Sequence, residues 1–164
     1  MRRYLLVLDM DLLAMDSEHD LEPINYLVAR QEQEPCEAVV LSLTDTSQAK
    51  LSAMELALGA QAGKFPVAPR PDHDIGAAAG HRMDRAVRHL TMIGCQASGL
   101  ISDRDLVKAV RAETACHDYD EVILATGRQG SSWLARMTGQ DPVQRLRRQW
   151  GERLTVFPGG PRRR

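Results

Sequence analysis

The sequence has no long run of apolar residues, and its first apolar stretch is cut short by acids. No segment approaches the roughly 18 consecutive apolar residues that a membrane-spanning helix requires, so we expect no membrane partner. The basic start Met1-Arg2-Arg3 leads into a run that Asp9 and Asp11 interrupt, and no small-residue cleavage site follows. This pattern argues against an export signal, and we expect a cytoplasmic protein.

Cysteine is also scarce. The three cysteines cannot all pair within one chain, and no two of them form a Cys-x-x-Cys motif. Cys36 and Cys95 border apolar runs, where a buried and unreactive thiol is the usual finding. We therefore expect reduced thiols at these two positions and at Cys116.

Net charge is nearly absent as well, at −1 for 164 residues. The total therefore exerts no bulk attraction on nucleic acid, and we expect no nucleic-acid partner. Residues 128–164 carry nine arginines against two acids, Asp141 and Glu152. This end of the chain is either an anion-binding region or a solvated surface. The length is that of one domain, expected over residues 1–158, with 159–164 as a basic, hydrated tail.

Apolar runs of strand length recur along the chain. Each is short and is ended by polar or turn-forming residues, as expected of parallel strands that are buried on both faces. The four strongest runs are Tyr4–Leu8, Ala38–Leu43, Glu121–Ala125 and Arg153–Phe157, and a weaker one is Gln96–Ile101.

Between these runs, apolar residues follow helical spacing. One helix is expected to begin near Pro23, and another has an apolar stripe from Ala79 to Ile93 that ends at Gly94. Ser102-x-x-Asp105 has the pattern of a capping box, in which the serine precedes the helix.

The last helix is expected to begin at Asp141-Pro142 and to end at Gly151. A further short helix is expected at about 46–58, followed by a connection at 59–77 that is rich in glycine, proline and alanine.

The alternation of strands and helices predicts an α/β fold, an open parallel sheet with helices on both faces. Such Rossmann-like sheets bind ligands beyond the carboxyl ends of their strands, where the strand order reverses. Three places meet this condition: Asp9, Thr44-Asp45 and Thr126–Gly130.

The end of the chain carries a recognisable order of motifs. After the run Glu121–Ala125 come Gly127-Arg128-Gln129-Gly130, eight further residues and Gly139-Gln140, followed by a helix and a last strand. This order resembles the universal stress protein family, whose nucleotide-binding members carry Gly-x2-Gly-x9-Gly-[Ser/Thr] in the same place. The first strand, which runs into Asp9, is also similar to that of the family. The resemblance extends over nearly the whole chain, with a longer middle section here.

The resemblance implies a single five-stranded parallel sheet in the order 3-2-1-4-5 and a small regulatory, stress-response protein. It also implies an adenine nucleotide, ATP or AMP, with any Mg²⁺ bound together with the nucleotide. Asp9 would lie beside the adenine, and the glycines would let main-chain N–H groups approach the phosphates. The residues expected to hold the nucleotide are Asp9, Gly127, Arg128, Gly130, Ser131, Gly139 and Gln140.

Three features depart from the family pattern. The interval between Gly130 and Gly139 is eight residues rather than nine, and Gln140 replaces a hydroxyl residue. Asp141 then occupies the expected N-cap of the last helix, where its carboxylate competes with a phosphate for N–H groups. The alternative function is therefore a dimeric interaction module of the same fold that binds a protein partner and no nucleotide.

No catalytic motif is present. Gly59-x-x-x-Gly63-Lys64 lacks the spacing of a Walker loop, and no general base can be assigned. Asp72-His73-Asp74 with His81 has no recognised metal-ligand spacing, and capping of the following helix explains His73 and Asp74 more simply. We expect no enzyme and no dedicated metal site.

The family resemblance finally implies a homodimer paired through the last strand. Leu154, Val156 and Phe157 fit that role, since an exposed apolar edge strand otherwise invites uncontrolled association.

Overall fold

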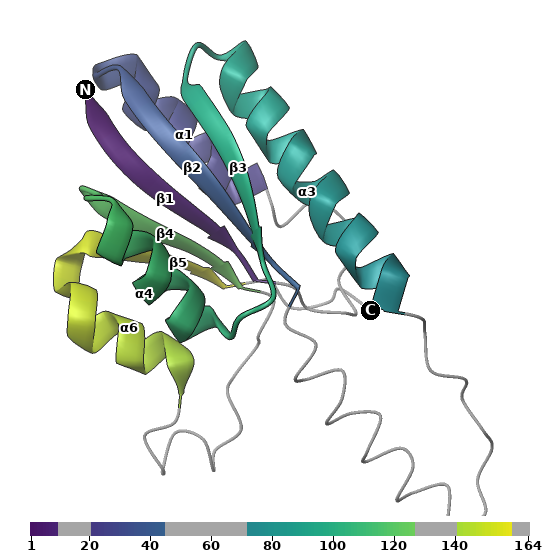
Figure 1. Cartoon of the computed structure of the whole chain (residues 1–164). Coiled ribbons are helices and arrows are strands. Elements are labelled where there is room, and N and C mark those ends of the chain that lie inside the picture. Colours follow the sequence, from purple (N-terminus) through teal and green to yellow (C-terminus); the bar gives the residue numbers. More distant parts are fainter. Residues whose placement is uncertain (10–20, 45–71, 127–140, 159–164) are drawn as a thin grey trace, which may run out of the picture.

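One twisted parallel sheet organises the chain. The computed structural model describes residues 1–9, 21–44, 72–126 and 141–158. These residues form a five-stranded sheet in the order β3-β2-β1-β4-β5, with every neighbouring pair parallel (Figure 1). The predicted α/β class and strand order are therefore confirmed. The strands are β1 (Arg2–Leu8), β2 (Cys36–Leu43), β3 (Gln96–Ser102), β4 (Glu121–Thr126) and β5 (Leu154–Pro158).

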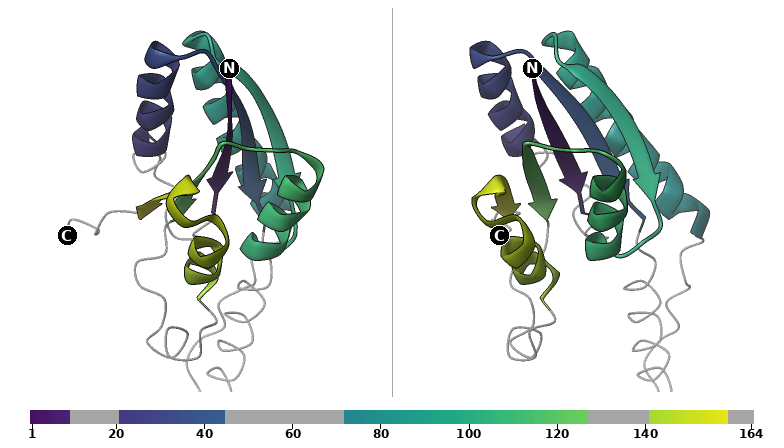
Figure 2. Two further views of the ribbon diagram at one scale, coloured as in Figure 1. Left: turned by 90° about the vertical axis from the view of Figure 1, so that its left-hand side faces the viewer. Right: turned by 60° about the vertical axis from the view of Figure 1, so that its left-hand side comes forward.

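Helices cover both faces of this sheet, as the two turned views in Figure 2 show. One face carries α1 (Leu21–Gln33) and α3 (Asp72–Met92), and the other carries α4 (Leu106–Cys116) and α6 (Pro142–Trp150). A short 3-10 turn, η1 (Gly151–Arg153), leads from α6 into β5. None of the helices in the described ranges combines the length and apolar character needed to span a bilayer.

The continuous apolar runs exist because the strands are buried on both faces. In β1, Leu5 and Val7 pack against the α4 and α6 side, whereas Tyr4, Leu6 and Leu8 pack against the α1 and α3 side. All five side chains are at most 2% exposed. Each such side chain contributes about 1.5–3 kcal/mol of burial free energy, so β1 and its neighbours form a rigid centre.

Most predicted helix ends are confirmed. Gly94 ends the α3 segment with a φ of 85°, a left-handed conformation that glycine adopts without strain. Asp141 is the N-cap of α6, since its Oδ1 accepts a hydrogen bond from the N–H of Val143 at 3.0 Å. Gly151 is the C-cap of the same helix.

Two boundary predictions are wrong. The connection expected to reach residue 77 ends earlier, because α3 begins at Asp72, and Gly76 and Ala77 lie within it. His73 and Asp74 consequently lie inside the first turn of α3 rather than before it. Alanine, the strongest helix former, occupies three of the positions that follow Gly76, which favours this early start.

The capping box is the second error. Asp105, not Ser102, is the N-cap of α4, and its Oδ1 accepts from the N–H of Lys108 at 2.9 Å. Ser102 remains extended because it is the last residue of β3, and its carbonyl accepts the N–H of Thr44 at 2.8 Å. This inter-strand bond keeps the chain out of the helix for three more residues.

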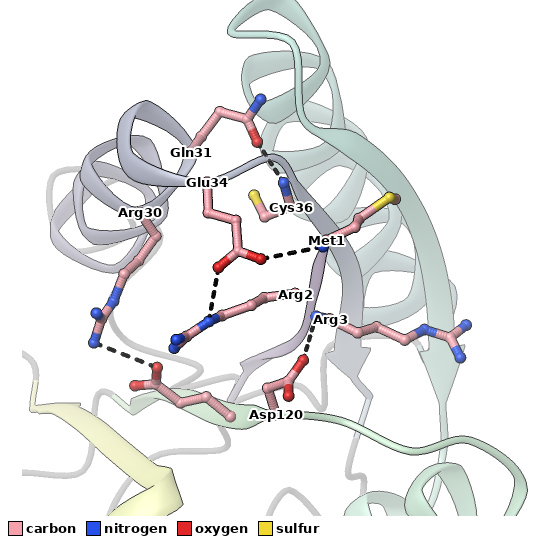
Figure 3. A network of polar contacts seen from close by, with 9 residues as sticks. Met1, Arg2, Arg3, Arg30, Gln31, Glu34, Cys36 and Asp120 are labelled. Atoms are coloured by element: carbon pink, nitrogen blue, oxygen red, sulfur yellow. Dashed lines mark hydrogen bonds and ion pairs between the residues drawn. The ribbon is translucent and has the colours of Figure 1, made fainter.

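The amino ends of the strands are joined by a polar network (Figure 3). Glu34, just beyond α1, pairs with the amino group of Met1 at 3.1 Å and with Arg2 Nε at 3.0 Å. The N–H of Arg3 donates to Asp120 Oδ2 at 2.8 Å. These contacts tie β1 to its neighbours at the amino edge of the sheet, opposite to the edge where a ligand is expected.

Candidate functional site

A buried carboxylate stands between the carboxyl ends of β1 and β4. The N–H of Asp9 donates to the carbonyl of Ala125 at 2.9 Å, which extends the ladder between the two strands by one residue. Asp9 Oδ2 then accepts a hydrogen bond from Thr126 Oγ1 at 3.1 Å. Asp9 is 2% exposed and Thr126 is 5% exposed. A buried carboxylate is costly unless hydrogen-bonded, so the hydroxyl of Thr126 helps to fix Asp9 in this position.

A cation from a helix joins this pair. The Arg82 guanidinium, on α3, donates to the carbonyl oxygen of Asp9 at 2.8 Å. Arg82 is half-buried and reaches over the end of the sheet, so the site contains a positive charge close to the Asp9 main chain. Arginine in such a place is well suited to anionic groups because its planar fork carries several N–H donors.

Hydroxyl groups accumulate at the same edge of the sheet. The hydroxyl of Thr44, just after β2, donates to the Ser102 carbonyl at 3.3 Å. Ser42 is fully buried, and its Oγ has no hydrogen-bond partner in the part of the chain that the structure describes. Ser42 aligns with Leu8 in the register of β1 and β2, one residue before the strand end. The carboxyl edge therefore holds more polar groups than the apolar strand runs suggest.

Asp141 lies directly before α6, as its N-cap. It is 9% exposed, and its carboxylate occupies the N–H of Val143 at the start of α6. The prediction that Asp141 is the N-cap of the last helix is therefore confirmed, and one N–H at the start of α6 is already bonded.

Of the predicted nucleotide-binding residues, Asp9 lies within the described residues, directly after the carboxyl end of β1. The other six lie outside the described residues: Gly127, Arg128, Gly130, Ser131, Gly139 and Gln140. Their two neighbours in the chain, Thr126 and Asp141, are described.

Two contributors were missed by sequence analysis. Nothing in the sequence marks Arg82 as a site residue, because charged residues between the apolar positions of a helix usually face solvent. Ser42 lies inside an apolar run, and that run predicts a strand and no site residue. Its polarity at the carboxyl end of β2 was the available clue.

Other candidate sites are weaker. Among the described residues, no group of three or more His, Cys, Asp or Glu side chains could hold a metal ion. An open groove of about 350 Å³ lies between β3 and α4 and is lined by residues that include Leu100, Ala109 and Glu113. Asp9 and Thr126 do not line this groove, although Ser102, at the carboxyl end of β3, does.

Sequence comparison gives no match, since no protein-family model and no curated protein is similar to the chain. Solved structures do match. A universal stress protein from Archaeoglobus fulgidus superposes with a TM-score of 0.56 at 7% identity, covering 96% of this chain and 93% of the other. The hypothetical protein MJ0577, whose biochemical function was assigned from its structure, gives 0.58 at 12% identity over 94% of both chains.

This chain has the universal stress protein fold. A third structure, the Archaeoglobus fulgidus universal stress protein in complex with dAMP, gives a TM-score of 0.51 at 11% identity. It covers 96% of this chain and 98% of that chain. The three alignments cover 94–96% of this chain, and identities of 7–12% explain why sequence comparison finds no match.

Proposed function

We propose that this protein is a small regulatory protein of the universal stress protein type that binds an adenine nucleotide at the carboxyl ends of β1 and β4. The observation that carries the proposal is the buried Asp9 carboxylate, held between these strands by Thr126. A carboxylate oxygen is a hydrogen-bond acceptor, and the exocyclic amine of adenine is a donor. The dAMP complex of a protein with the same fold supports the class of ligand.

The phosphates would lie near the glycine residues after β4. Gly127, Gly130 and Gly139 allow main-chain N–H groups to approach phosphate oxygens, and Arg128, Ser131 and Gln140 supply further donors. Mg²⁺ would bind only as part of the nucleotide complex. We assign no residue a catalytic role, and the proposed function is binding and regulation rather than catalysis. We also propose that the protein acts in the cytoplasm.

The proposed nucleotide site is tested by calorimetric titration of ATP with magnesium into protein that has been freed of co-purified nucleotide. We expect micromolar binding that is lost in Gly130→Asp, because a carboxylate among the phosphate-binding N–H groups repels the ligand. The matched control is Gly76→Asp, which places the same charge on an exposed position of α3 with open space around it. Equal binding by both variants, or no binding by the wild-type protein, contradicts the proposal.

A second candidate function is a dimeric interaction module that recruits a protein partner and no nucleotide. The observation that favours it is the capping bond from Val143 to Asp141, which occupies an N–H at the start of α6. Absence of ATP binding in nucleotide-free protein would select this alternative.

We also propose that the protein is a homodimer paired through β5. In the sheet that the described residues form, β5 pairs with β4 alone, and its other edge is the one that we propose pairs with a second copy. Leu154, Val156 and Phe157 pack largely against their own chain, so main-chain pairing would supply more of the contact than these side chains. Light scattering is expected to give twice the 18.2 kDa mass of one chain, and a monomer at micromolar concentration would contradict this.

A further inference from the structure

Two cysteine thiols that are 59 residues apart in the sequence touch in the core. Cys36 is the first residue of β2, and Cys95 immediately precedes β3. Their neighbours Glu37 and Gln96 are register partners, which places the two cysteines opposite one another at the amino ends of adjacent strands. The two Sγ atoms are 3.1 Å apart, and the side chains are 2% and 3% exposed.

The surrounding fold holds the two segments together. Gln31, near the end of α1, accepts a hydrogen bond from the N–H of Cys36 at 2.7 Å, a contact drawn in Figure 3. The amide nitrogen of Gln31 also donates to the carbonyl of Gly94, the residue before Cys95, at 3.2 Å. The N–H of Cys95 bonds to the carbonyl of Leu90 at 3.0 Å. One glutamine side chain thus bridges the main chain beside both cysteines, so their proximity is built into the fold.

We propose that Cys36 and Cys95 form a redox-modification site, a dithiol that hydrogen peroxide converts into an intramolecular disulfide. A disulfide needs a sulfur–sulfur distance of about 2.0 Å, so the two sulfurs must approach by about 1 Å. Neighbouring strands lie about 4.8 Å apart, within the range of Cα separations that a disulfide spans. The exposed Cys116 takes no part.

The reaction uses one peroxide for each dithiol. One sulfur, as its thiolate, attacks a peroxide oxygen, which yields a sulfenic acid and, with one proton, the first water. The second sulfur attacks the sulfenic sulfur, its proton leaves with the displaced hydroxide as the second water, and the sulfur–sulfur bond forms. Two thiols and one hydrogen peroxide give one disulfide and two waters, so two electrons pass from sulfur to oxygen.

Burial makes this site slow rather than sensitive. Burial, together with the contact to Cys36, raises the pKa of the Cys95 thiol to about 12, so very little of it is thiolate at neutral pH. The two buried thiols therefore react during sustained treatment with peroxide, or when this end of the sheet opens transiently. Brief treatment with peroxide oxidises the exposed Cys116 instead.

The bond would close a loop that contains all of α3. It would join the edge strand β3 covalently to β2, and cross-linking across so long a loop restricts the unfolded chain strongly. Oxidised protein should therefore be more stable than reduced protein, which gives the modification a readout separate from nucleotide binding.

The test uses full-length Cys116→Ser protein, in which two thiols remain. After incubation with hydrogen peroxide and removal of the oxidant, we expect the thiol count in denaturant to fall from two to none. We also expect the intact mass to drop by two hydrogens and a peptide map to link Cys36 to Cys95. The thermal midpoint should rise by roughly 5 °C or more and return with dithiothreitol.

The matched control is Cys36→Ala in the same background, which retains Cys95 alone and should show no dithiothreitol-reversible shift in the thermal midpoint. Retention of both thiols after prolonged peroxide overturns the proposal. Mass increases from added oxygen without a link, or disulfides between chains on a non-reducing gel, overturn it as well.

Discussion

Replacing Asp9 with alanine is expected to abolish adenine-nucleotide binding and to lower the free energy of unfolding by about 1–3 kcal/mol. Binding is lost because the proposed acceptor for the adenine amine is removed. Stability falls because the buried hydroxyl of Thr126 loses the carboxylate oxygen to which it donates at 3.1 Å. Calorimetry measures the first effect, and denaturant unfolding measures the second.

Asp9→Asn separates these two roles. The amide oxygen of asparagine can still accept the hydrogen bond from Thr126, so this variant should retain most of the wild-type stability. Its amide nitrogen would then face the adenine amine, donor against donor, and binding should weaken at least tenfold, or about 1.4 kcal/mol. A stable Asp9→Asn protein that binds ATP as tightly as wild type would show that Asp9 does not contact the base.

The position of Asp9 could be predicted because local signals and a general rule agree. An apolar run ended by an acid marks the end of a buried strand, and parallel strands bring such ends to one edge. The carboxyl-terminal end of α3 and both ends of α6 could be predicted as well, since Gly94, Asp141 and Gly151 each perform a local task that few residue types perform well.

The contacts that complete the site could not be predicted, because they join residues that are distant in sequence. Arg82 reaches Asp9 across 73 positions, and nothing near Arg82 in the sequence distinguishes it from a surface residue. Cys36 and Cys95 meet only because β2 and β3 are neighbours in a particular register. The capping box failed for the same reason, since the bond between Thr44 and Ser102 outweighs a local helix signal.

Raising the pH is expected to destabilise the reduced protein steeply, beginning near pH 9 to 10. Burial, with a hydrogen bond donated to Glu113, raises the pKa of Tyr119, and burial raises the pKa of Tyr4. The Cys95 thiol has its pKa raised to about 12 by burial. In each case the unfolded chain loses the proton at a lower pH than the folded chain does. The stabilisation is therefore complete below the unfolded pKa and disappears as the pH rises through the folded one.

Each group that titrates in this way adds about 1.4 kcal/mol to the loss for every pH unit between its unfolded and folded pKa values. Denaturant unfolding of the reduced protein between pH 8 and pH 11 measures how steeply the free energy of unfolding falls with pH. This range spans the pH values at which free thiols and free tyrosines ionise. Tyr119→Phe should be less stable at pH 8 by about 1–2 kcal/mol but should lose stability more slowly above pH 10. Glu113 keeps a partner in that variant, since His117 Nδ1 lies 2.9 Å from its Oε1.

The same measurement connects the alkaline response to the dithiol. A disulfide has no proton to lose, so peroxide-treated protein should show a shallower decline than reduced protein from about pH 9, where free thiols begin to ionise. Tyr119→Phe should instead flatten the curve only at the higher pH of tyrosine ionisation. Identical slopes for wild-type protein and Tyr119→Phe would mean that the buried tyrosine does not control alkaline stability. If the effect of the disulfide begins at a lower pH than the effect of Tyr119→Phe, the first is assigned to the thiols between β2 and β3. The second is then assigned to the tyrosine that packs with β4 and α4.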